Sequence, residues 1–113
     1  MIDNLIEERS VYVYRGVCDM RWSFDRLAMI VNERLEQDPR SGKVYVFLNR
    51  GQNKIKALYW DEDGYVLWHK RLESGQFPMP GGEGFKINAV GWKSMMAGVD
   101  VRTARRKRSY KKI

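Results

Sequence analysis

The side chains with the clearest chemical potential in this sequence are cationic and lie at its end. Lysine and arginine neutralise backbone phosphates, and arginine can also pair with a phosphate through two parallel hydrogen bonds. The segment therefore predicts sequence-independent affinity for nucleic acid, with docking on an acidic protein surface and simple solubility as the alternatives. Its basic residues, with no acidic residue among them, are Arg102, Arg105, Arg106, Lys107, Arg108, Lys111 and Lys112.

The formal net charge of +7 belongs to this terminal segment. Without its basic residues, the lysines and arginines of residues 1–101 equal the 14 acidic residues of the chain. The sequence therefore predicts one formally neutral domain over residues 1–101 and a flexible basic tail over residues 102–113. A length of 113 residues agrees with a single small domain.

A second group of cations lies beside aromatic residues in the middle of the chain. Exposed aromatic rings with flanking cations can stack bases and pair phosphates. The alternative, which we favour, is that most of these rings form the core and the cations form a solvated rim. The cations are Arg50, Lys54, Lys56, Lys70 and Arg71, and the aromatic residues are Tyr45, Phe47, Tyr59, Trp60, Tyr65 and Trp68.

Candidates for catalysis or metal binding are few. The acidic trio Asp61, Glu62 and Asp63 could offer oxygen ligands to a divalent metal, but neighbouring side chains in a turn diverge, so we interpret it as a solvated turn. His69 as a general base and Cys18 as a nucleophile would each need an oriented partner, for which the sequence gives no pattern. We expect no catalytic set, no metal and no cofactor.

The first half of the chain contains a strand pattern followed by a helix pattern. Residues 11–14 are β-branched or aromatic and predict a strand. From Phe24 to Leu35 the apolar residues recur at helical spacing, with Ser23 as a plausible N-cap and Asp38-Pro39 as the stop. This pattern predicts an amphipathic helix.

Three further strands are predicted over residues 43–48, 55–60 and 65–70, joined by short loops in which Gly51 and Gly64 suit positive φ. Residues 75–84 are rich in glycine and proline and predict a loop, residues 85–89 a short strand, and residues 90–99 a helix. The fold class is therefore α+β, with a small antiparallel sheet that contains a three-strand meander, a long amphipathic helix packed on it, a short C-terminal helix and a basic tail.

The compartment is expected to be cytoplasmic. A single cysteine excludes an internal disulfide framework, and no apolar run approaches the ~18 residues of a membrane span. The first residues also lack the basic-then-apolar order of a signal peptide. We expect no membrane partner.

The sequence resembles those of the TnpB-type accessory proteins, also called Orf2, of the IS sixty-six family of bacterial insertion sequences. The resemblance covers roughly residues 11–100. It is carried by Val13-Tyr14, Gly16, Asp19-Met20-Arg21, Ser23-Phe24-Asp25, Leu27, Asn49-Arg50, Lys56-Ala57-Leu58-Tyr59-Trp60-Asp61, Gly64-Tyr65, Leu67-Trp68, Lys70-Arg71-Leu72-Glu73 and Gly75-Gln76-Phe77.

The resemblance implies a non-enzymatic accessory role in DNA transposition, beside a separate transposase of the same element. Arg21, Arg50, Lys56, Lys70 and Arg71 match the family and are also cationic, which makes them candidate contacts. The expected function is to bind nucleic acid, DNA in particular, to help assemble the transposase on element ends, or to do both. The alternative is a protein interaction module that binds the transposase through its aromatic sheet without contacting DNA. The sequence leaves the oligomeric state open.

Overall fold

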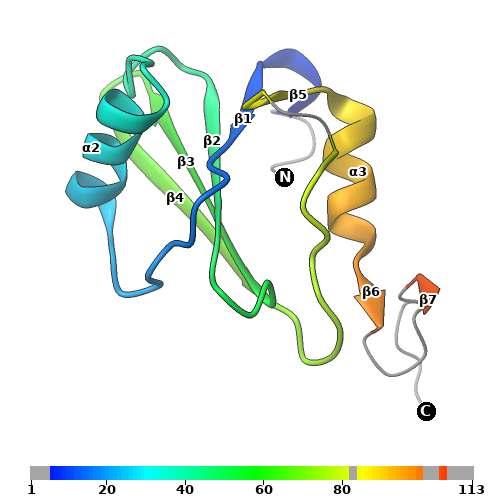
Figure 1. Ribbon diagram of the computed structural model, residues 1–113. Coiled ribbons are helices and arrows are strands. Elements are labelled where there is room, and N and C mark those ends of the chain that lie inside the picture. Colours follow the sequence, from blue (N-terminus) through cyan, green and yellow to red (C-terminus); the bar gives the residue numbers. More distant parts are fainter. Residues whose placement is uncertain (1–5, 82–83, 101–104, 107–113) are drawn as a thin grey trace.

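The computed structural model describes residues 6–81, 84–100 and 105–106. Five strands form one sheet in the order β4-β3-β2-β1-β5. Helices α2 and α3 lie on opposite sides of this sheet, so the body has three layers (Figure 1). Within the described ranges, no helix is both long enough and apolar enough to cross a bilayer.

The sheet is mixed, and the expectation of a purely antiparallel sheet needs one correction. β1 (Val11–Val13) runs parallel to β2 (Val44–Leu48), with Val11 opposite Val44. Parallel neighbours require a long crossover, which residues 14–43 supply with α2. β5 (Lys86–Ile87) then pairs antiparallel with β1 at the sheet edge.

The predicted three-strand meander is confirmed. β2, β3 (Lys54–Asp61) and β4 (Gly64–Arg71) pair antiparallel in sequence order. The turns use different residues from those expected, because the positive φ angles belong to Gln52 (55°) and Glu62 (52°). Gly64 instead begins β4, opposite Asp61.

The predicted amphipathic helix is confirmed as α2 (Phe24–Arg34). Ser23 has the extended backbone of an N-cap, although its side chain makes no capping hydrogen bond. Leu27, Ile30 and Val31 are the buried residues of this helix. They belong to a core cluster with side chains of β2 and β3, namely Tyr45, Phe47 and Leu58.

The opposite face of the sheet is covered by α3 (Ala89–Ala97), which confirms the predicted C-terminal helix. Its N-cap Asn88 accepts a hydrogen bond from the Gly91 backbone at 2.8 Å. The buried residues Trp92 and Met95 join a core cluster with alternate residues of β1, β2 and β3. The Trp92 ring lies 6.0 Å from that of Trp68.

Residues 72–81 form the predicted loop, and hydrogen bonds anchor it to the body. Phe77 is fully buried, and its backbone amide donates to the Gln52 carbonyl at 2.6 Å. The Arg15 guanidinium donates to three carbonyls, those of Pro80 (2.6 Å), Gly81 (3.1 Å) and Gly84 (2.8 Å). These bonds tie the end of the loop to the segment that follows β1.

The last described elements form a separate two-stranded sheet. β6 (Val99–Asp100) pairs antiparallel with β7 (Arg105–Arg106). Strand β7 differs from the flexible tail predicted over residues 102–113, a prediction that followed from the few apolar residues available there for burial. The rest of the basic tail lies outside the described residues.

Candidate nucleic-acid interface

The β3-β4 register lines up basic residues at one end of the hairpin. Lys54 lies directly opposite Arg71, and Lys56 lies directly opposite His69. Alternate residues of a strand share a face. Leu58 and Leu67, which continue the same alternation, pack in the cluster under α2. We call these four residues, Lys54, Lys56, His69 and Arg71, the His69 cluster, on the α2 face of the sheet.

The members of the His69 cluster influence one another electrostatically. Partial burial lowers the pKa of His69 below its usual 6.5, and the positive charges of Lys56, Lys54 and Arg71 lower it further. The imidazole is therefore neutral at pH 7, and its protonation is opposed by three nearby cations. A bound anion would counteract these positive charges and favour the protonated form of His69.

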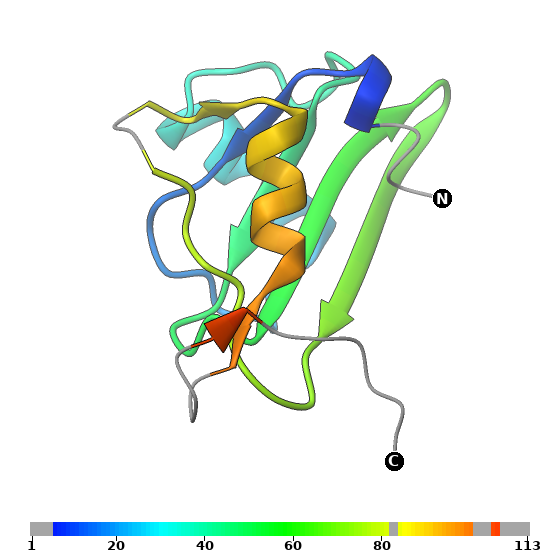
Figure 2. The same ribbon diagram turned by 90° about the vertical axis from the view of Figure 1, so that its right-hand side faces the viewer.

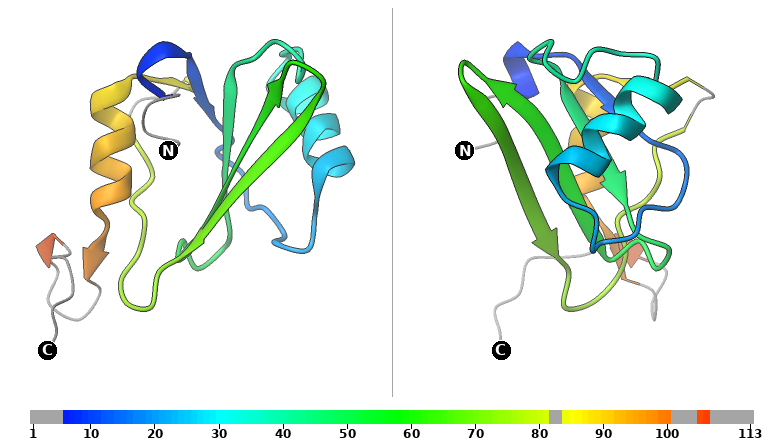
Figure 3. Two further views of the ribbon diagram at one scale, coloured as in Figure 1. Left: turned by 180° about the vertical axis from the view of Figure 1, so that it is seen from behind. Right: turned by 90° about the vertical axis from the view of Figure 1, so that its left-hand side faces the viewer.

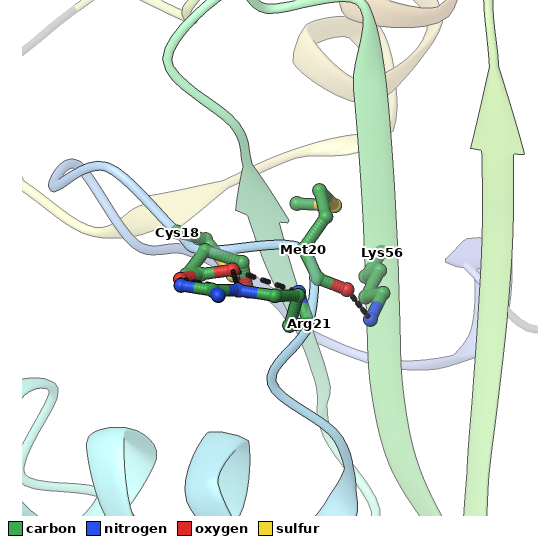
Figure 4. Close-up of polar contacts among 5 residues, drawn as sticks. Cys18, Met20, Arg21 and Lys56 are labelled. Atoms are coloured by element: carbon green, nitrogen blue, oxygen red, sulfur yellow. Dashed lines mark hydrogen bonds and ion pairs between the residues drawn. The ribbon is translucent and has the colours of Figure 1, made fainter.

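Lys56 is the buried member of the cluster. It is 6% exposed, and its ammonium donates to the backbone carbonyls of Met20 and Trp22, both at 2.7 Å. Figure 4 shows the lysine reaching from β3 to the loop that precedes α2. The two hydrogen bonds of the Lys56 ammonium are thus directed at the protein's own backbone, and contact between Lys56 and nucleic acid stays a prediction.

The loop held by Lys56 carries a preorganised arginine. The Asp19 carboxylate accepts hydrogen bonds from the Arg21 backbone at 2.9 Å and from its guanidinium Nη2 at 2.6 Å. These bonds lower the pKa of Asp19 to about 2. The side chain of Arg21 is nevertheless 89% exposed. The loop therefore displays a cation on the same face as the His69 cluster.

The other predicted contacts are distributed over different surfaces. Arg50 is exposed in the loop before β3, and Lys54 is half-buried. Lys70 and Arg71 are both exposed, but as neighbours in a strand they point to opposite faces. Arg71 also forms an ion pair of 3.1 Å with Glu73. The structure thus brings together Lys54, His69 and Arg71, and it separates Lys70 from them.

The predicted contacts in the tail are described in part. Arg105 and Arg106 are the two residues of β7. Five further candidates, Arg102, Lys107, Arg108, Lys111 and Lys112, lie outside the described residues.

The aromatic residues mostly serve the core, as favoured from the sequence. Tyr45 and Phe47 are fully buried under α2. Trp60 and Tyr65 are half-buried and meet edge to face at 5.0 Å, and the Arg40 guanidinium lies 4.9 Å from the Trp60 ring. These rings already have partners within the chain, so the sheet offers no open platform of stacked aromatics in this region.

Cys18 and the acidic turn complete the set of chemical candidates. Burial raises the pKa of the Cys18 thiol to about 11, which keeps it protonated at neutral pH. Asp61 ends β3, and Glu62 and Asp63 form the turn to β4; all three residues are exposed. Among the described residues, no group of three or more histidines, cysteines, aspartates or glutamates is arranged to hold a metal ion.

The chain matches one known protein family over most of its length. The model of the family described as "IS66 Orf2 like protein" matches residues 9–106. The chain belongs to the IS66 Orf2-like family. This result confirms the resemblance seen in the sequence, and members of this family are accessory proteins of insertion sequences.

Two relatives from Sinorhizobium fredii (strain NBRC 101917 / NGR234) support the assignment. The chain is 34% identical to the uncharacterized protein y4hO over 94 residues, which cover 81% of this chain and 82% of y4hO. It is 36% identical to the uncharacterized protein y4jC over 62 residues, which cover 55% of this chain and 53% of y4jC. No solved structure matches the chain significantly. The IS66 Orf2-like family is not a known enzyme family.

Proposed function

We propose that this IS66 Orf2-like protein is a non-enzymatic accessory factor of transposition that binds the DNA backbone. Its proposed contacts are Lys54 and Arg71 of the His69 cluster, together with the basic tail. The observation that supports this proposal is the pairing of Lys54 with Arg71 across the β3-β4 ladder. Like charges directly opposite each other destabilise a sheet. A phosphate group bound between them would offset that cost.

The local charge balance supports an anion as the ligand. Arg71 has Glu73 as a partner at 3.1 Å, and Arg21 has Asp19 at 2.6 Å. Within the described part of the chain, these are the ion pairs present, so Lys54 is not neutralised by a carboxylate. Phosphates of a nucleic-acid strand fit this surface because they need cations and hydrogen-bond donors but no base-specific groups.

The double substitution Lys54→Gln with Arg71→Gln tests the role of the cluster. We expect it to weaken binding to an unrelated duplex and to flatten the slope of log K against log salt by about 1 to 2 units, at ~0.9 per lost phosphate contact. Lys93→Gln in α3 is the control, since Lys93 is exposed on the opposite side of the sheet. An unchanged slope in the double variant would refute the proposed site.

Assembly with the transposase is the second part of the proposal. A pull-down of the transposase from the same element, with and without nuclease, separates a DNA bridge from direct contact. Loss of the complex after nuclease treatment is expected if DNA joins the two proteins. A complex that survives nuclease and persists in the Lys54→Gln, Arg71→Gln variant would instead favour a direct protein contact.

A further inference from the structure

β4 is an edge strand of the five-stranded sheet, and no other strand of the described residues pairs with its outer side. It is 8 residues long, and its hydrogen-bonded neighbour is β3. It runs along one border of the sheet in two opposite side views (Figures 2 and 3). In the described part of the chain, no backbone hydrogen bond outside the β3-β4 ladder reaches residues 64–71. Such an edge leaves backbone donors and acceptors free to pair with another strand.

The free strand has an apolar centre and ends of opposite charge. Its middle, Tyr65 to Trp68, is half-buried. An exposed acidic turn, Asp61–Asp63, precedes it, and the exposed residues His69, Lys70 and Arg71 end it. The two ion pairs present among the described residues involve neither the acidic turn nor Lys70. Both ends of the edge therefore carry uncompensated charge.

We propose that β4 pairs antiparallel with β4 of a second copy of this chain, forming a two-fold symmetric dimer. A two-fold axis places the acidic turn of each copy beside the basic end of the other. A pairing centred on Val66 sets Glu62 opposite Lys70, and one centred on Leu67 sets Asp63 opposite Arg71. A parallel arrangement would instead bring like charges together. Opposite charges across an antiparallel pair are favourable, and a symmetric contact uses each pair twice.

The dimer would extend the sheet without changing either copy's fold. Since the axis is perpendicular to the sheet, both His69 clusters would lie on the same face. At ~3.3 Å per residue, their His69 positions would be roughly 20 Å apart along the strand direction in the pairing centred on Val66, and roughly 13 Å apart in the pairing centred on Leu67. Standard interfaces bury ~1,200 Å² or more. We expect less from one strand of 8 residues in each copy, and therefore reversible association. This inference concerns self-association and does not rest on the proposed binding of DNA.

Sedimentation of the full chain without nucleic acid, over concentrations that reach the millimolar range, tests the proposal. The apparent mass should rise from 13.4 kDa toward twice that value. It should rise less at high salt, because salt screens the paired charges. Two charge-reversed proteins, E62K/D63K and K70E/R71E, should each remain monomeric. Their equimolar mixture should recover the dimer, since each variant then meets complementary charges at both ends.

Controls separate this contact from its rivals. K93E, in α3, lowers the net charge in the same direction as K70E/R71E, by half as much, and should leave the dimer intact. The melting temperature shows that each variant is folded. A wild-type protein that stays monomeric throughout would overturn the proposal. So would a mixture that fails to associate although the wild-type protein dimerises. If the basic end serves to repel other strands, K70Q/R71Q would associate more strongly than the wild-type protein, which would also overturn it.

Discussion

At the scale of single residues, Lys56 is a cation whose hydrogen bonds hold a loop of the fold in place. Its ammonium bonds two carbonyls of the loop before α2 and is 6% exposed. The loop in turn carries the Asp19-Arg21 pair. One buried lysine therefore fixes the position of an exposed arginine on the same face.

Replacing Lys56 by methionine should destabilise the protein. The side chain keeps nearly the same length but loses its donors, which leaves the Met20 and Trp22 carbonyls without their partner. Leaving a buried polar group unpaired costs about 1–3 kcal/mol in the free energy of unfolding. Urea denaturation measures this loss, with Lys93→Met as the exposed control. Equal losses in the two variants would show that the Lys56 hydrogen bonds do not stabilise the loop.

His69 predicts a particular dependence of stability on pH. Burial and nearby cations lower the pKa of His69 in the folded protein below its usual 6.5. In the window below 6.5 the unfolded chain binds more protons, so stability is lost as the pH falls. Comparing urea denaturation at about pH 7.5 and about pH 5.5, we expect a smaller loss for His69→Gln than for the wild-type protein. The pKa of Asp19 is lowered from 3.8 to about 2, so its titration lies outside this window. Identical losses would contradict the role assigned to His69.

At the scale of elements, α2 stabilises the sheet by inserting apolar side chains between itself and β2 and β3. Leu27 is fully buried, whereas Met29 on the same helix is 42% exposed. Leu27→Ala should therefore lower the free energy of unfolding by about 2–5 kcal/mol. Met29→Ala, the matched control, should change it by less than about 0.5 kcal/mol. A loss below about 0.5 kcal/mol for Leu27→Ala as well would mean that the packed face of α2 is misassigned.

Local sequence patterns predicted the elements better than their pairing. The helix spacing from Phe24 and the apolar runs of β2 to β4 depend on neighbours along the chain, and each predicted element is present. The parallel pairing of Val11 with Val44 depends on a crossover of distant residues, which no local pattern encodes. Positive φ at Gln52 and Glu62 similarly reflects the closure of each hairpin rather than residue preference.

Local sequence patterns also predicted the candidate interface only in part. Lysines at positions 54, 56 and 70 look alike in the sequence, yet Lys56 is buried and Lys70 faces away from Lys54. The alternation along β3 and β4 could have placed Lys54 and Lys56 on the face of Leu58, and His69 and Arg71 on that of Leu67. The carbonyls that hold Lys56 come from a loop more than 30 residues earlier, so its burial could not be read from the strand alone.

At the scale of the whole molecule, charge is divided between a neutral body and a basic tail. The net charge of +7 is accounted for by residues after Val101. The described body adds a smaller cationic surface at the His69 cluster. The two regions therefore predict two contributions to DNA affinity that can be removed separately.

Truncation after Val101 should remove the larger contribution. If roughly four to six tail cations reach phosphates, the slope of log K against log salt should flatten by about 3 to 5 units on duplex DNA, at ~0.9 per contact, and by less on single strands, at ~0.7. The melting temperature should change little, because β7 pairs with β6 in a separate two-stranded sheet. The measurement is binding to unrelated oligonucleotides between low and moderate salt, for the full and the truncated chain.

Adding Lys54→Gln and Arg71→Gln to the truncated chain completes the comparison. The remaining shallow slope should then fall further, because the cluster and the tail neutralise different phosphates. Equal affinity and equal slope for the full and truncated chains would exclude the tail as a nucleic-acid element. In that case any measured affinity would have to come from the body. If neither the full nor the truncated chain binds nucleic acid, direct contact with the transposase would be left as the basis of the accessory role.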